Sequence, residues 1–367
     1  MNKETAKKDI KLFPIPVIII LSLSLIGVVV FCLFSVSTAF SDFVMKYIGT
    51  PIRVSLAFVT NLIPFSLAES ILIASPIIIV TASAVAIRHY SATWRLTGAF
   101  MLRALSALCC VWIIFVFGFA GGYKGTSLDK KLGFERNKVS PAELEYTASV
   151  LLDEVNRLAN EIDYVPNGPS VMPYSFEEMT KKLNEAYKVL DTQYDAIDTF
   201  YSRPKQVILS EPWTYTHIAG VYTFFTGESN INVNFPDYTL PYTTAHEMAH
   251  QRGISREDEA NFVAFLACAA SDDPYIRYSG YQSLYEYVRS ALYSADRDAY
   301  NEIRSGEDIR VQYESYSYSL FFDKYRENVV ANVSGNINNS YLQSQGTVGT
   351  KSYGMVVDLA CAYFKDK

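Results

Sequence analysis

The sequence predicts an α+β protein in which N-terminal transmembrane helices precede a mainly helical domain with a small β-sheet. The first third of the chain holds apolar runs long enough to cross a bilayer. The remainder is polar and tyrosine-rich, and short β-branched and aromatic segments lie between its helical patterns. Half of the 367 residues are hydrophobic and only 19% are charged, which is low for a wholly soluble protein. The net charge of -6, without a basic stripe, argues against nucleic acid as a partner.

Residues 1–122 are predicted to be a membrane region, so the lipid bilayer is an expected partner. Each crossing needs about 20 apolar residues, and three runs meet this requirement, at 15–36, 67–87 and 100–120. The first run is predicted to be a retained anchor, because no small-residue cleavage site follows it. Residues 51–65 are too polar for a clear span and are expected to lie along the outer membrane surface.

The distribution of Lys and Arg predicts the orientation. Basic residues precede the first run and lie between the second and third, at Lys3, Lys7, Lys8, Lys11, Arg88, Arg95 and Arg103. The connection between the first two runs has only Lys46 and Arg53. The chain is therefore expected to be a multi-pass cell-membrane protein with a cytoplasmic N-terminus and an extracytoplasmic domain at 123–367.

Helix-start signals and residue spacing predict the elements of this domain. Ser-x-x-Glu capping boxes begin helices at 140–162 and 175–190. Extended segments are predicted at 205–209, 220–227 and 230–234. An aromatic helical stretch at 308–333, a loop or lid at 334–349 rich in Asn, Ser and Gly, and a short apolar helix at 355–364 are expected to complete the domain.

A His-Glu-x-x-His motif at 246–250 carries the clearest chemical signal. Positions four apart share one face of a helix, so His246 and His250 can present their imidazoles to one metal ion. Glu247 is then suitably placed to act as a general base on water activated by Zn²⁺. The alternative is an amphipathic helix with two structural histidines.

A third ligand is expected just beyond this helix. Gly253 allows the chain to leave the helix in a left-handed turn, after which Ser255 is expected to cap a new helix. Glu257 is favoured as the ligand because Asn261 follows it at i+4, a spacing that suits a residue orienting a ligand histidine. Glu259 is the alternate ligand, although it points to a different face.

This part of the sequence resembles a known family. The block His246-Glu-Met-Ala-His250-Gln-Arg-Gly253, continuing through Arg256-Glu-Asp-Glu-Ala-Asn-Phe262 and Arg277-Tyr-Ser-Gly-Tyr281, is similar to a bacterial family catalogued as a domain of unknown function. The similarity extends over most of the chain, including Ile63-Pro-Phe-Ser66 and Ser352-Tyr-Gly354. The resemblance implies N-terminal membrane spans, a zincin-like extracytoplasmic domain and a membrane-bound zinc metallopeptidase. The interval from His250 to Glu257 is shorter than in thermolysin-like gluzincins.

The expected activity is hydrolysis of peptide bonds in a peptide or protein substrate, with Zn²⁺ as cofactor. Arg277 is a candidate for binding a substrate carboxylate or the developing oxyanion, and His217 and Tyr222 are further oxyanion candidates. An edge strand of the sheet would suit an extended peptide. Two other functions stay open: a catalytically inactive zinc-binding sensor or binding module, and a small-molecule transport or binding protein. The sequence indicates no oligomeric state.

Overall fold

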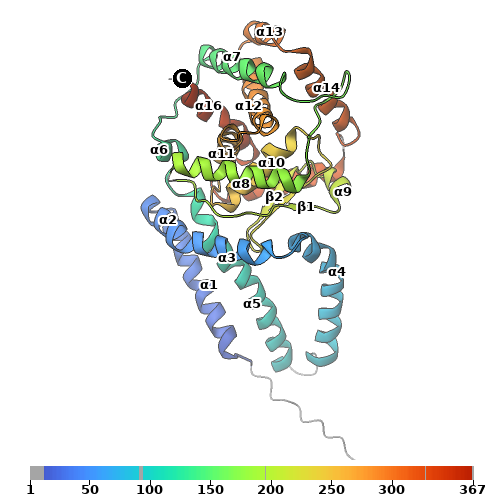
Figure 1. Cartoon of the computed structure of the whole chain (residues 1–367). Helices are drawn as coiled ribbons and strands as arrows, with labels where there is room; N and C mark the ends of the chain where they lie inside the picture. The colour runs from blue at the N-terminus through green and yellow to red at the C-terminus, as the bar shows by residue number, and fades with distance from the viewer. Residues whose placement is uncertain (1–11, 91–93, 195, 327, 366–367) are drawn as a thin grey trace, which may run out of the picture.

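A computed structural model describes residues 12–90, 94–194, 196–326 and 328–365. Three long helices, α1, α4 and α5, extend from one side of a helical domain (Figure 1). The predicted combination of N-terminal apolar helices, a mainly helical domain and a small sheet is confirmed at this level. The basic N-terminal residues Lys3, Lys7, Lys8 and Lys11 lie outside the described residues.

The three helices are long and apolar enough to cross a membrane. They are α1 (Ile15–Phe34), α4 (Leu67–Val85, continuing as a π-helix, η2, at Ala86–Tyr90) and α5 (Trp94–Gly118). Helices α1 and α5 lie side by side, with the rings of Phe31 and Trp112 5.4 Å apart. Helix α4 stands apart, and none of its most apolar stretch is buried.

Short helices form the junction between the spans and the domain. They are α2 (Thr38–Val44), the π-helix η1 (Met45–Gly49) and α3 (Thr50–Asn61), and α3 lies across the ends of the long helices (Figure 1). The buried side chain of Arg53 donates hydrogen bonds to the carbonyl oxygens of Gly118, at the end of α5, and Arg252, in the domain. These bonds satisfy main-chain acceptors on both sides of the junction and join span and domain.

Helix α4 is joined to the domain through carboxylates. Glu69, in its first turn, accepts hydrogen bonds from the amides of Ile208 and Leu209 at 3.0 and 2.8 Å. Glu228 of the sheet accepts in return from the amides of Leu67 and Ala68, both at 3.0 Å. Because the free amides of a helix N-terminus favour negative charge, Glu228 suits this position. Glu69 thus fixes the helix to the domain.

The sheet has three strands in the order β1-β3-β2. They are β1 (Lys205–Gln206), β2 (Gly220–Thr223) and β3 (Glu228–Ile231), with β1 parallel and β2 antiparallel to β3. The strands are shorter than predicted, and the third begins before the predicted segment. All four β3 residues are buried, including Glu228, Ser229 and Asn230, because β3 is central and both its faces are covered. A strand that is buried on both faces need not alternate polar and apolar residues, so the sequence of β3 did not indicate where the strand begins.

The helices of the domain surround a large core to which α7, α8, α10, α11, α12 and α16 contribute. Their bounds are α6 (Leu128–Leu132), α7 (Pro141–Leu158), α8 (Phe176–Gln193), α9 (Ser210–Thr214), α10 (Thr239–Gln251), α11 (Glu257–Ala269), α12 (Pro274–Ala295), α13 (Arg297–Ser305), α14 (Ile309–Asp323), α15 (Val329–Ser344) and α16 (Val356–Phe364), with 3-10 helices η3 (Ala120–Tyr123) and η4 (Gly349–Met355). The predicted capping box at Ser140 and Glu143 is present.

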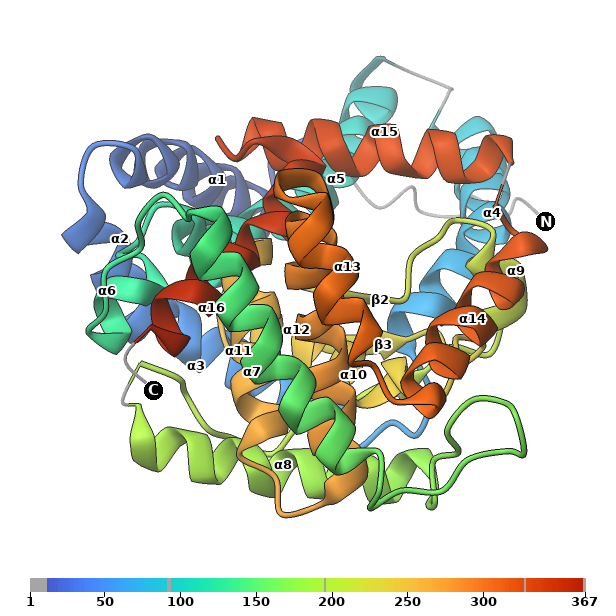
Figure 2. The same cartoon turned by 90° about the horizontal axis from the view of Figure 1, so that it is seen from above.

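The predicted loop or lid at 334–349 is wrong, because most of this segment belongs to helix α15. Asn328 caps the helix by accepting a hydrogen bond from the amide of Ala331 at 2.7 Å. Leu342 is fully buried near the other end, against residues of α1 and α5. Cap and tertiary packing therefore override the low helix propensity of the Asn, Ser and Gly residues. Figure 2 shows α15 along one side of the domain, next to α5.

Candidate metal centre

Helix α10 carries the His-Glu-x-x-His motif through the centre of the domain. Pro241 lies in the first turn of the helix, where it needs no hydrogen-bond partner for a main-chain amide. The hydroxyl of Ser279 accepts a hydrogen bond from the amide of Tyr242, also in the first turn, at 3.0 Å. His246 and His250 lie one turn apart on the same face, with ring centroids separated by 4.6 Å. Both side chains are buried.

A sharp turn brings the next helix back over this face. Gly253 has a φ of +94°, which a residue with a side chain adopts only with strain, as the sequence predicted. The predicted cap at Ser255 is wrong: its hydroxyl instead donates to the carbonyl oxygen of Phe119 at 2.9 Å, and Arg256 is the N-cap residue of α11. The turn places Glu257, the first residue of α11, opposite the two histidines.

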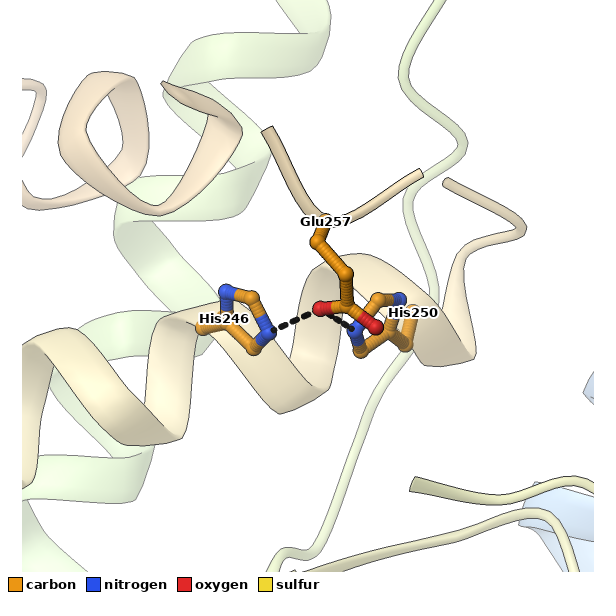
Figure 3. Close-up of side chains that lie close together, drawn as sticks. All are labelled: His246, His250 and Glu257. Carbon is orange, nitrogen blue, oxygen red and sulfur yellow. Dashed lines mark hydrogen bonds and ion pairs between the residues drawn. The ribbon is translucent and has the colours of Figure 1, made fainter. Parts of the chain in front are cut away.

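The three side chains converge on one point (Figure 3). One carboxylate oxygen of Glu257 lies 3.3 Å from Nε2 of His246 and 3.2 Å from Nε2 of His250. These residues form a group whose ligand atoms all lie within 4.8 Å of one another, so they could hold a metal ion. Tetrahedral zinc with bonds of about 2.0–2.1 Å keeps its donor atoms about 3.3 Å apart. The two distances from the Glu257 oxygen match this spacing, so the three side chains could hold a tetrahedral metal ion and leave its fourth coordination position open.

Hydrogen bonding and charge favour this arrangement. Nδ1 of His250 donates to the carbonyl oxygen of Ile254 at 2.7 Å and leaves Nε2 facing Glu257, so the neutral ring would offer its Nε2 lone pair to a metal ion. Among the described residues, Nδ1 of His246 is buried without a hydrogen-bond partner. Burial lowers the pKa of His250, but the charge and hydrogen bond of Glu257, together with Glu247 and the Ile254 carbonyl, raise this pKa to about 9. The pKa of Glu257 is far below its usual value, because the two histidines outweigh the effect of its burial.

Glu247 lies beside the same centre, against the sheet. Its side chain is buried, and Oε2 has no hydrogen-bond partner among the described residues. The hydroxyl of Ser229 donates to the main-chain carbonyl of Glu247 at 2.9 Å and ties α10 to β3. Burial raises the pKa of Glu247 against the lowering effect of His246 and His250. A buried carboxylate with a raised pKa and one unpartnered oxygen is suited to exchange protons.

The other acidic candidate is held elsewhere. Glu259 accepts a hydrogen bond from the amide of Leu128 at 2.9 Å and pairs with Arg256 at 2.8 Å. It is not part of the metal-competent group found in the described chain. Asn261 is buried near the centre, but its side-chain amide donates to the carbonyl oxygen of Tyr353 at 3.2 Å rather than to a histidine.

The three residues predicted for substrate or oxyanion binding lie in different places. Arg277 forms an ion pair with Glu154 at 2.6 Å and does not line the cavity beside the histidines. His217 lines that cavity, but its Nε2 donates to the carbonyl oxygen of Tyr325 at 2.6 Å. Tyr222 also lines the cavity, with its ring 5.5 Å from that of Phe119 and its hydroxyl buried.

The cavity has a volume of about 990 Å³, and His246, Glu247, His250 and Glu257 form part of its wall. Further lining residues are tyrosines that the sequence did not predict as site residues, namely Tyr123, Tyr242, Tyr287, Tyr341 and Tyr353. The ring of Tyr353 lies nearly parallel to that of His246, with centroids 6.5 Å apart. The late Ser-Tyr-Gly sequence at 352–354 is the only sequence feature that pointed to any of these tyrosines.

Comparisons with known proteins give one positive result. No curated protein and no solved structure matched the chain. A family profile described as "Protein of unknown function (DUF3810)" matches residues 40–361, which include the second and third apolar helices and the whole metal centre. The chain belongs to this family of proteins of unknown function.

Proposed function

We propose that the protein is a membrane-anchored zinc metallopeptidase. The observation that carries this proposal is the convergence of His246, His250 and Glu257 beside the buried carboxylate of Glu247, on the wall of a large cavity. Two histidines, one further ligand and an adjacent carboxylate with an unpartnered oxygen are the parts that a zinc hydrolase needs. A purely structural zinc site would not need such a carboxylate next to it.

The division of labour follows from the positions of the side chains. His246, His250 and Glu257 would hold Zn²⁺, which when bound acts as a Lewis acid toward a carbonyl and makes water more acidic. Glu247 accepts a proton from the attacking water, whose oxygen bonds to the carbonyl carbon of the peptide. The C–N bond then breaks, and Glu247 returns the proton to the leaving nitrogen. The products are a carboxylic acid and an amine.

The edge strand β2 supports a peptide as the substrate. The sheet order leaves one side of β2 without a partner strand among the described residues. Its residues Gly220, Val221 and Tyr222 line the cavity next to Glu247. An extended peptide can form main-chain hydrogen bonds with such an edge, which places a carbonyl near the metal centre without requiring a particular side chain.

The proposed location is the cell membrane, with the metal centre on the outer side. Three helices could cross the bilayer, and the short connection near Arg88 and Arg95 is the basic one. Basic connections stay in the cytoplasm. Since the C-terminal end of α4 and the N-terminal end of α5, which carry these arginines, point away from the domain, the domain would be extracytoplasmic.

The test uses the full chain, purified in detergent and loaded with zinc, on a mixed peptide library. Wild type is expected to hydrolyse peptides, and Glu247→Gln to bind zinc equally but lose at least about 100-fold in rate. Glu185→Gln, which changes an exposed glutamate 69% accessible to solvent, is the matched control and should keep full activity. Zinc binding without hydrolysis by wild type, or equal hydrolysis by Glu247→Gln, would refute the assignment.

A further inference from the structure

The metal centre lies directly against the end of a membrane helix. Phe119 is the first residue after α5, and the edge of its ring contacts that of His250, with centroids 6.0 Å apart. The hydroxyl of Ser255, between His250 and Glu257 in sequence, donates to the Phe119 carbonyl oxygen. No separate layer of protein therefore stands between the metal ligands and the end of this helix.

The cavity is bounded by two elements that both approach α5. Strand β2 starts near His217 and leads to Phe224, whose ring is 5.1 Å from that of Phe115 in α5. The side chain of Asn328, the N-cap residue of α15, lies 3.5 Å from that of His217, and the Tyr341 ring later in the helix is 6.4 Å from the same Phe115. Strand and helix thus run in the same direction along the cavity, and the cavity reaches the membrane helix at one end.

Helix α15 presents an uncovered row of apolar side chains to the cavity, beside the polar Ser334 and Asn338. Val329, Val330, Val333 and Ile337 line the cavity, yet each is 52–76% exposed. Leaving such side chains in water forgoes about 1.5–3 kcal/mol each relative to full burial. A contiguous apolar row of this kind marks a binding surface. Its continuity with the aromatic end of α5 indicates an apolar occupant that comes from the bilayer.

The membrane region leaves lateral access for such an occupant. The apolar stretch of α4 has no buried residue, while α1 packs on α5. The N-terminus of α4 is bound to β3 through Glu228. The exposed helix therefore begins at the sheet that bounds the cavity and extends away from the domain (Figure 1). A membrane-spanning segment of another protein can lie against α4 with the chain that follows it entering the cavity.

We infer that the substrate of the proposed peptidase is a membrane-anchored polypeptide, cleaved in the segment next to its own apolar span. This inference rests on the proposed function and adds the class of substrate. From Gly220, beside Glu247, to Phe224 the strand covers about 13 Å at about 3.3 Å per residue. The cleaved bond should therefore lie within about ten residues of the apolar segment. Anchoring in the same bilayer would also raise the local substrate concentration.

The experiment compares two substrate libraries with the zinc-loaded full chain in lipid vesicles. In one, a random segment of about ten residues joins a single apolar span of about 20 residues to a soluble tag. In the other, a polar helix of equal length replaces the span. The anchored library is expected to be cleaved at least about tenfold faster, within the random segment. Equal cleavage, or faster cleavage of the soluble library, would overturn the inference and leave the peptidase assignment intact. No cleavage of either library would overturn both.

Variants on α15 test the apolar row itself. Val333→Asp puts a charge on the cavity face and should lower the ratio of anchored to soluble cleavage by about tenfold, because a buried charge next to an apolar segment is unfavourable. Asn336→Asp adds the same charge at an exposed position that does not line the cavity, and should leave the ratio unchanged. An unchanged ratio in Val333→Asp would contradict the role of this row.

Discussion

Gly220 and Glu247 are in direct contact across the boundary between the sheet and the motif helix. A β-carbon at position 220 would lie 2.7 Å from both Cγ and Oε1 of Glu247. Only glycine allows β2 to come this close to the carboxylate. The strand therefore fixes where Glu247 can lie, and a change in the strand tests the position of the proposed base without altering its chemistry.

Gly220→Ala is expected to displace the carboxylate of Glu247 and lower peptide hydrolysis by about 100-fold, the usual effect of moving a catalytic group by about 1 Å. Zinc binding should not change, because position 220 is not a ligand. Gly335→Ala is the control: its added methyl group would meet nothing within 4 Å. Full activity in Gly220→Ala would show that the close contact does not position the base.

Glu257 and Glu259 are expected to respond differently to the same substitution. Glu257→Gln should weaken zinc binding by at least about 100-fold, since an amide replaces the anionic ligand. Glu259→Gln should bind zinc like wild type but lose about 1–3 kcal/mol of stability, because Arg256 and the Leu128 amide lose their charged partner. Competition with a fluorescent chelator and thermal unfolding measure the two effects. If Glu259→Gln weakened zinc binding and Glu257→Gln did not, Glu259 would be the metal ligand and Glu257 would not.

Glu314 gives the protein a pH-dependent stability that is independent of the metal. It is buried and accepts hydrogen bonds from the Ser170 amide and the Tyr278 hydroxyl. Burial raises its pKa from 4.5 to about 7. The protonated Glu314 therefore stabilises the folded protein fully below about pH 4.5. This stabilisation is lost as the pH rises to 7, because the glutamate of the unfolded chain loses its proton at a lower pH than that of the folded protein.

Glu314→Gln should remove this pH dependence. As the pH rises from 4.5 to 7, the free energy of unfolding of wild type should therefore fall by about 3 kcal/mol relative to that of the variant. Denaturant unfolding of both proteins at several pH values measures the difference. Glu185→Gln, at an exposed position, should track wild type throughout. A difference between Glu314→Gln and wild type that does not vary with pH would mean that Glu314 titrates normally.

Local signals in the sequence predicted most of the elements around the site. The spacing of His246 and His250 placed both on one face, and Gly253 predicted the left-handed turn. Glu257 and Glu259 remained alternatives because both lie in the first turn of α11, and the entry angle of this helix depends on the preceding turn. The contact of Gly220 with Glu247 depends on long-range packing, which no sequence period reports.

Helix α15 shows where composition misleads. Its Asn, Ser and Gly residues indicated a loop, whereas Asn328 caps a helix whose apolar residues recur at helical spacing at Val329, Val333 and Ile337. Burial of Leu342 against the ends of α1 and α5 stabilises the helix through contacts more than 200 residues apart in sequence. The ring of Tyr353 lies beside that of His246 through another contact between residues far apart in sequence.

X-ray absorption at the zinc edge of the zinc-loaded full chain tests the metal centre most directly. The arrangement of His246, His250 and Glu257 predicts nitrogen and oxygen donors at about 2.0–2.1 Å, with outer-shell scattering from two imidazoles. His250→Ala should lose one imidazole from this signal. Sulfur donors at about 2.3 Å, or a spectrum without imidazole scattering, would contradict the proposed centre.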